Sequence, residues 1–244
     1  MGWSGRRNEF LIYIQINYSF FFTLFAINYY IMEFIEKELA DYCESHTSPE
    51  TAVLTQLNRE THLKVISPRM LSGHLQGRFL SLLSSLYKPS FILEIGTYTG
   101  YSAICLAEGL TENGKLISID VNEETSTFAQ SFISKTDYAA KIQLVVADAK
   151  NYITTINEPL DIVFIDADKK NYLAYYHLVI DKLKSGGLII ADNVLWSGKI
   201  TMPVAKMDKE TLALHEFNEY VQLDSRVENM LIPLRDGLMI VRKK

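Results

Sequence analysis

From residue 91 onward, short apolar runs alternate with longer stretches in which apolar residues recur at helical spacing. The strand-like runs lie at 91–95, 116–120, 142–146, 162–166 and 188–192. The stretches between them are long enough for a helix each and have the periodicity of helices. Because this alternation is typical of βαβ units, the pattern predicts an α/β fold with a doubly wound, mostly parallel sheet.

The end of the chain has a different pattern. The segment "ENMLIPLRDGLMIVRKK" contains two strand-like runs joined by Arg235-Asp236-Gly237. An Asp-Gly pair between two apolar runs is a hairpin signal. We therefore expect the sheet to finish with an antiparallel C-terminal strand.

Helices are expected ahead of the first strand. Residues 48–65 begin with Ser-Pro-Glu, which predicts a helix with Ser48 as N-cap and Pro49 in the first helical position. Residues 73–87, "GHLQGRFLSLLSSLY", have apolar positions at helical spacing and end at a Lys-Pro-Ser break. The fold thus acquires N-terminal helices, and no linker divides it.

The N-terminus departs from this pattern, because residues 10–32 carry no charge and are long enough to span a bilayer. A signal peptide would fit Arg6 and Arg7, but no small-x-small cleavage site follows. A membrane anchor would place these arginines in the cytoplasm and the rest of the chain outside. In a third interpretation, translation starts at Met32 and residues 1–31 are an apolar extension of the gene prediction. The functional domain then covers residues 32–244, and we expect it in the cytoplasm.

Composition narrows the class of protein. The 244 residues, 48% hydrophobic and 22% charged, suit one large globular domain. The formal net charge of −5 argues against a general nucleic-acid binder, which needs a basic face. The two cysteines, Cys43 and Cys105, have no CxxC spacing and indicate a reducing compartment. We assign chemistry to neither.

A glycine-containing loop, "EIGTYTGYS", follows the first strand. Gly96 and Gly100 bracket a turn that would let a ligand approach the backbone at a helix N-terminus. Tyr98 stands where a dinucleotide fingerprint has its middle glycine, which disfavours NAD or FAD. Glu94 suits a ligand with positive charge, such as the amino group of a methionine-derived moiety. A plain strand–helix turn is the alternative.

Two further strand ends extend this candidate site. Asp120 ends the second strand, where an acid typically accepts hydrogen bonds from ribose hydroxyls. It could instead cap the next helix, a role for which Asn122 competes. Asp148 and Ala149 follow the third strand, where an adenine ring would lie. Together these positions describe a nucleoside site.

Polar side chains also follow the fourth and fifth strands. Asp166 ends one strand, and Asp192 and Asn193 end the next. Adjacent parallel strands lie about 4.8 Å apart, so these oxygens can converge. Two carboxylates and an amide suit a hard divalent cation such as Mg²⁺. Alternatively, Asp166 or Asp168 caps a helix, although capping would not explain the acid–amide pair on the neighbouring strand.

Four motifs in order, "LEIGTYTGYS", "FIDADKKNY", "ADNVLWSGK" and "PLRDGLMIVRK", resemble the cation-dependent class I O-methyltransferases of the caffeoyl-CoA and catechol type, especially small bacterial members. The resemblance spans residues 32–244. It implies two cofactors, S-adenosylmethionine (SAM) and a divalent cation, which we expect to be Mg²⁺. The residues that would contact SAM are Met70, Ser72, Glu94, Gly96, Thr97, Ser102, Asp120, Ala149, Asp166 and Asp168. Those that would bind the metal are Asp166, Asp192 and Asn193.

The resemblance also implies a mechanism and partners. Lys169 and Asp166 would be the catalytic residues, with Lys169 as general base, in a homodimer that methylates one of two vicinal hydroxyls on an aromatic ring. A metal that chelates both oxygens makes the hydroxyl more acidic and fixes the line of attack. The same cation disfavours the ammonium form of Lys169, whose amine can then accept the proton. Alternatively, Lys169 is a solvent-exposed partner of Asp168; Lys170 has no assigned role.

The acceptor and three rival functions stay open. Residues 194–215 vary among such proteins; Trp196 and Tyr172 could line an aromatic pocket or simply pack. The first rival is an NAD(P)-dependent oxidoreductase, against which Tyr98 and Glu94 argue. The others are a nucleic-acid methyltransferase, which the acidic charge disfavours, and a non-catalytic binding protein. Calorimetry with S-adenosylhomocysteine (SAH) against NAD distinguishes the first.

Overall fold

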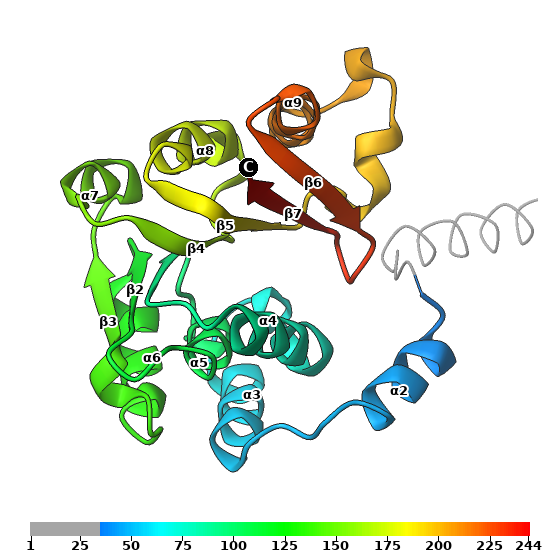
Figure 1. Ribbon diagram of the computed structural model, residues 1–244. Coiled ribbons are helices and arrows are strands. Elements are labelled where there is room, and N and C mark those ends of the chain that lie inside the picture. The colour runs from blue at the N-terminus through cyan, green and yellow to red at the C-terminus, as the bar shows by residue number, and fades with distance from the viewer. Residues whose placement is uncertain (1–34) are drawn as a thin grey trace, which may run out of the picture. The chain divides into compact units, whose positions relative to one another are not determined.

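The computed structural model describes residues 35–244, in which helices cover both faces of a seven-stranded sheet (Figure 1). The strands are β1 (Phe91–Ile95), β2 (Lys115–Asp120), β3 (Ile142–Val146), β4 (Leu160–Ile165), β5 (Leu183–Asp192), β6 (Val227–Ile232) and β7 (Leu238–Lys243). Their order is β3-β2-β1-β4-β5-β7-β6, and β7 runs antiparallel to both of its neighbours, β5 and β6, whereas the other pairs are parallel. The predicted doubly wound sheet with an antiparallel C-terminal strand is confirmed.

Two layers of helices enclose this sheet. The α-helices are α2 (Lys37–Ser45), α3 (Ala52–Lys64), α4 (Gly73–Tyr87), α5 (Tyr101–Ala107), α6 (Glu123–Ile133), α7 (Ala149–Thr155), α8 (Tyr172–Ile180) and α9 (Lys209–Leu223). The short 3-10 helices are η1 (Pro68–Met70), η2 (Ala139–Lys141), η3 (Lys169–Asn171), η4 (Trp196–Thr201) and η5 (Val204–Lys206). Helices α7, α8 and α9 pack on one face, and α3 to α6 pack on the other (Figure 1).

The central strands are buried on both faces, as expected of a parallel sheet between two helical layers. Every residue of β1 and β4 is buried. Strand β5 begins five residues before the predicted start, since Leu183 already pairs with Leu160 at the beginning of β4. The glycines between these positions hid that extension from the apolar pattern.

The predicted start of the helix at residues 48–65 is wrong. Helix α3 begins at Ala52, and Thr51 is its N-cap, because its hydroxyl accepts a hydrogen bond from Leu54 N at 3.3 Å. The preceding residues are held elsewhere: the Ser48 carbonyl accepts from the His74 ring at 2.7 Å. The Glu50 carboxylate accepts from the Tyr101 hydroxyl at 2.6 Å. Tertiary contacts therefore extend this segment and delay the helix.

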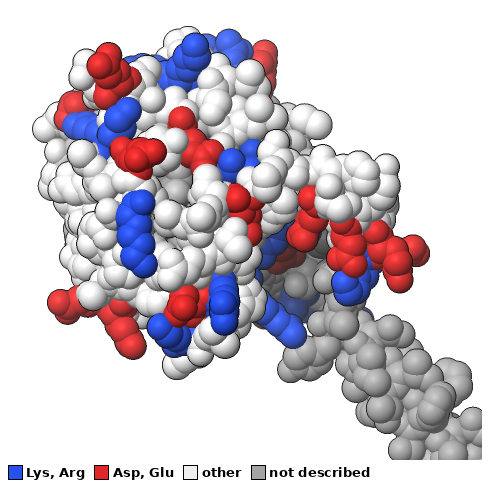
Figure 2. Space-filling view, turned by 90° about the horizontal axis from the view of Figure 1, so that it is seen from below, with Lys and Arg blue, Asp and Glu red and all other residues white. Residues whose placement is uncertain are grey.

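The predicted extension over residues 1–31 lies outside the described residues and stays a prediction. Within residues 35–244, no helix has both the length and the apolar character needed to cross a membrane. Cys105 is buried and Cys43 is half-buried. Acidic and basic side chains are interspersed on the face drawn in Figure 2.

Candidate functional site

A cavity of about 1070 Å³ opens at the carboxyl ends of the parallel strands. It lies where the strand order reverses between β1 and β4, the usual position for a ligand in an open α/β sheet. The predicted cofactor residues that line it are Met70, Gly96, Asp120, Ala149, Asp166 and Asp168. The other four predicted residues, Ser72, Glu94, Thr97 and Ser102, are buried and do not line the cavity.

The glycine loop has the tight geometry that its sequence suggested. Gly96 has φ +102°, and a Cβ atom there would lie 1.9 Å from the Asp166 carbonyl oxygen. Gly100 has φ +83° and precedes α5. Between them, Tyr98 adopts φ 48° and donates its hydroxyl to the carbonyls of Ile66 and Ser67, at 3.1 and 3.2 Å. The loop thus brings the end of β1 against the end of β4, and its Tyr98 side chain contacts the segment that follows α3.

Glu94 lies beneath this loop and is fully buried. The hydroxyl of Ser118 donates to its Oε2 atom, whereas Oε1 forms no hydrogen bond of normal geometry with any residue of 35–244. Burial raises the pKa of this carboxyl to about 8, against the lowering effect of the Ser102 and Ser118 hydroxyls. A positively charged ligand group would give the carboxyl the partner that it lacks.

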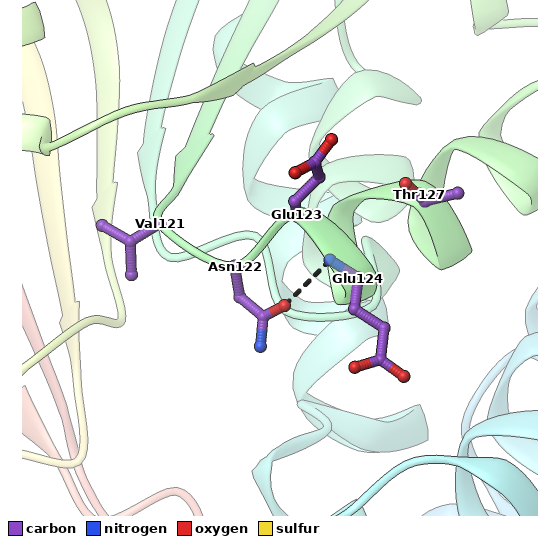
Figure 3. A pocket seen from close by; sticks show the side chains of 5 residues that line it. All are labelled: Val121, Asn122, Glu123, Glu124 and Thr127. Carbon is purple, nitrogen blue, oxygen red and sulfur yellow. Dashed lines mark hydrogen bonds between the residues drawn. The ribbon is translucent and has the colours of Figure 1, made fainter.

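Asp120 is not a helix cap. Its carboxylate accepts from the backbone N–H groups of Thr97 and Tyr98, at 3.0 and 2.8 Å, and so holds the glycine loop. Asn122 caps α6 by accepting from Glu124 N at 2.9 Å (Figure 3). A shallow pocket at this junction shares residues with the main cavity and includes Val121, which is 75% exposed.

The acidic strand ends come together as predicted. Ile165 of β4 pairs with Ala191 of β5, so Asp166 and Asp192 follow at the same level of the sheet. Asp192 is 2% exposed; burial and then the charge of Asp166 raise its pKa to about 7. Gln76 of α4 donates from Nε2 to Asp192 Oδ2 at 2.6 Å. Sequence reasoning missed Gln76, whose only signal was a polar residue among apolar positions of a helix.

Lys169 is buried among these oxygens. Its ammonium donates to Asp166 Oδ1 at 3.1 Å, Asn193 Oδ1 at 2.7 Å and the Tyr172 hydroxyl at 2.7 Å. The alternative of a solvent-exposed lysine paired with Asp168 is therefore wrong. Asp168 is exposed and accepts from the Asn171 amide and the Tyr175 hydroxyl, without capping η3.

The donor set fits a divalent metal ion. Oxygens of Asp166 and Asn193 already surround one cation, the ammonium of Lys169. Carboxylate and amide oxygens are ligands that Mg²⁺ accepts. Over residues 35–244 no three His, Cys, Asp or Glu side chains gather at a metal-binding distance, so an amide has to complete any such site.

The acceptor side of the cavity follows β5. Trp196 lines the cavity, its ring 5.7 Å from Lys169 Nζ, and its Nε1 atom is buried without a partner among the described residues. Non-glycine residues with positive φ cluster here: Asn193, Trp196 and Ser197. Tyr172, in contrast, is fully buried and packs edge-on against Phe217. Packing, rather than an acceptor wall, is thus the correct interpretation of Tyr172.

Comparisons with known proteins identify relatives of this chain. A family model described as O-methyltransferase matches residues 44–244. Caffeoyl-CoA O-methyltransferase 1 of Arabidopsis thaliana is 36% identical over 184 residues, covering 69% of each chain. The SAH-bound Podospora anserina methyltransferase PaMTH1 has a TM-score of 0.78 at 26% identity, covering 86% of this chain and 97% of its own. TomG of Streptomyces achromogenes, an O-methyltransferase solved in complex with SAM, has a TM-score of 0.79 at 25% identity, covering 85% and 96%.

Proposed function

This chain belongs to the O-methyltransferase family that contains its caffeoyl-CoA O-methyltransferase relatives, and from this premise we propose a cation-dependent methyl transfer from SAM to an aromatic hydroxyl. The acceptor would be a catechol-like or caffeoyl-type ring with two vicinal hydroxyls. The proposal rests on Asp166, Asp192 and Asn193, which line one cavity, with Lys169 bonded to Asp166 and Asn193. Membership of this family also removes the NAD(P)-dependent oxidoreductase as a rival.

The cofactor half of the proposal rests on two acidic side chains and two apolar contacts. Asp120 faces the cavity, where ribose hydroxyls could donate to its carboxylate. Glu94 Oε1 has no hydrogen-bond partner within residues 35–244, and the positively charged amino group of SAM would supply one. Met70 and Ala149 offer apolar contacts at the cavity wall.

The metal half rests on the oxygen donors. A divalent cation, which we expect to be Mg²⁺, would bind to Asp166, Asp192 and Asn193. Gln76 orients one oxygen of Asp192 by donating a hydrogen bond to it. When bound, such a cation makes a chelated hydroxyl more acidic and orients its oxygen.

Lys169 supplies the proton acceptor. The Tyr172 hydroxyl donates to the Asp192 carbonyl at 2.9 Å, so toward Lys169 it can only accept. That contact fixes the direction of the amine, which then takes the hydroxyl proton at Nζ. We propose that the enzyme is a homodimer in the cytoplasm, as the family resemblance implies.

Metal removal tests the proposal. We expect chelation to lower methyl transfer from SAM to a panel of caffeoyl, catechol and flavonoid acceptors by roughly 100-fold or more, with recovery on addition of Mg²⁺. Asp192→Ala should lose this activity yet bind SAH like the unmodified enzyme in calorimetry. Asp181→Ala, which removes an 82% exposed acid, is the control. Activity that survives thorough chelation would contradict the metal role.

A second measurement addresses Lys169. Lys169→Ala should slow the reaction and flatten its rise with pH, because no amine is left to accept the proton. Lys170→Ala, at the exposed neighbouring position, should leave the pH profile unchanged. A pH profile of Lys169→Ala that matches the unmodified enzyme would rule out the base role.

A further inference from the structure

Residues 65–72 join α3 to α4 and contain Met70 and Ser72, two of the proposed SAM contacts. Little side-chain packing fixes this segment: Ile66 is 89% exposed and Met70 is 59% exposed, while Leu71 is buried. Ser67 adopts a left-handed conformation, with φ 63°. Something other than the hydrophobic core must hold the segment at the cavity.

Two side chains from distant parts of the chain bond to its carbonyl groups. Tyr98 of the glycine loop donates to Ile66 and Ser67. The guanidinium of Arg235 donates through Nη1 to the Ser72 carbonyl and through Nη2 to the Arg69 carbonyl at 3.3 Å. The flat fork of an arginine holds its donors in fixed directions toward two acceptors, whereas the ammonium of a lysine is a compact charge on a flexible stem.

Arg235 belongs to the turn between β6 and β7, residues 233–237, and this turn is fixed to the loop after β5. The Asp236 carbonyl accepts from Leu195 N at 2.9 Å, and its carboxylate accepts from Ser197 N at 2.5 Å. The Gly237 carbonyl accepts from Val194 N at 3.1 Å. A Cβ atom on Gly237 would lie 2.4 Å from Leu195 Cγ, so the Leu195 side chain packs directly against the Gly237 backbone.

We propose that Arg235 is a positioning residue for SAM binding, and that the 233–237 turn joins segment 65–72 to the acceptor loop, residues 193–198. Arg235 acts through the backbone of its neighbour: it holds Arg69 and Ser72 in the arrangement that places Met70 at the cavity. Since the same turn holds the loop that contains Asn193 and Trp196, cofactor and acceptor loops share one support. This inference rests on the proposed function.

Loss of the guanidinium should weaken cofactor binding without unfolding the protein. Arg235 is an exposed side chain, so its removal leaves the core intact. The freed segment must then be ordered when the cofactor binds, and the cost of that ordering reduces affinity. An Arg235→Met change keeps the length and apolar stem but removes both donors. Arg235→Lys keeps the charge but loses the rigid planar fork.

Calorimetry with SAH tests the positioning role on the full chain. We expect the Kd for SAH to rise about tenfold in Arg235→Met and by a smaller factor in Arg235→Lys. Arg242→Met, which breaks an exposed ion pair with Glu228 on the same hairpin, should leave the Kd unchanged. Equal SAH affinity in Arg235→Met and the unmodified protein overturns the role. Failure of the unmodified protein to bind SAH would instead refute the proposed function itself.

Hydrogen exchange tests the connection between the loops. In the unmodified protein, SAH should slow amide exchange in residues 65–72 and also in residues 193–198. In Arg235→Met, protection of 193–198 on addition of SAH should be lost, whereas Arg242→Met should keep it. Protection of 193–198 that is the same in Arg235→Met overturns the shared support, and so does its absence from the unmodified protein.

Discussion

Among single residues, the buried side chain of Gln76 has a direct effect on the candidate metal site, because it bonds to one of the proposed ligands. It is fully buried on α4, donates to Asp192, and leaves its own Oε1 atom without a partner in the described chain. An unsatisfied buried oxygen is costly, so the contact with Asp192 is the one interaction that accounts for an amide at this position.

From this contact we predict that Gln76→Leu weakens metal binding. Groups that orient a metal ligand typically change affinity by about 10-fold to 100-fold when removed. Titration with Mn²⁺, followed by electron paramagnetic resonance, measures the effect without turnover. Ser84→Ala, which removes another buried polar group of α4, is the matched control. Equal Mn²⁺ affinity in Gln76→Leu and Ser84→Ala would contradict the prediction.

Glu94 gives a pH dependence of stability at the same scale. Burial raises its pKa from 4.5 to about 8. Between these values the unfolded chain releases the proton that the folded protein retains, so the free energy of unfolding falls as pH rises from about 4.5 to about 8. In ligand-free protein, Glu94→Gln should therefore lose less Tm over this range than the unmodified chain. Glu228→Gln, at an exposed site, should behave like the unmodified chain; a parallel decline in Glu94→Gln would refute the assignment.

At the scale of elements, the contact between β1 and β4 depends on Gly96. Any side chain there would meet the Asp166 carbonyl at 1.9 Å, and the backbone has φ +102°. Gly96→Ala should destabilise the protein by about 3 kcal/mol, because the two strands must separate and the residue is strained.

Chemical denaturation measures this loss. The control is Gly186→Ala, where φ is +80° but nothing lies within 4 Å of the added Cβ atom. That variant carries only the conformational cost, about 1 kcal/mol. Equal losses in the two variants would mean that the close approach of β1 to Asp166 contributes nothing.

Local patterns predicted the strands better than the helix ends. Strand β1 has the predicted bounds, because a buried strand reads as a continuous apolar run. The edge strand β3 also has the predicted bounds, although it is only partly buried. The start of α3 was wrong because contacts with residues far along the chain, His74 and Tyr101, hold the segment before it. No local signal reports such contacts.

At the scale of the whole molecule, the order of the strands creates the site. The chain reverses direction across the sheet between β1 and β4, so the loops after β1, β2, β4 and β5 all open on one cavity. The hairpin of β6 and β7 then closes the edge and brings Arg235 back to a segment 163 residues earlier. A single topology thus supplies the cofactor side, the candidate metal donors and the turn that connects them.

The sequence by itself determined the class of fold, the strand ends that carry Asp120, Asp166 and Asp192, and the family resemblance. These features are local: apolar periodicity and short motifs record which residues are buried and which end a strand. Only the tertiary structure decided what each side chain contacts. It buried Lys169 among oxygens, assigned the α6 cap to Asn122, and placed Gln76 and Arg235 on partners far away in the chain. Such contacts depend on how helices and loops pack across the sheet, which spacing along one chain does not encode.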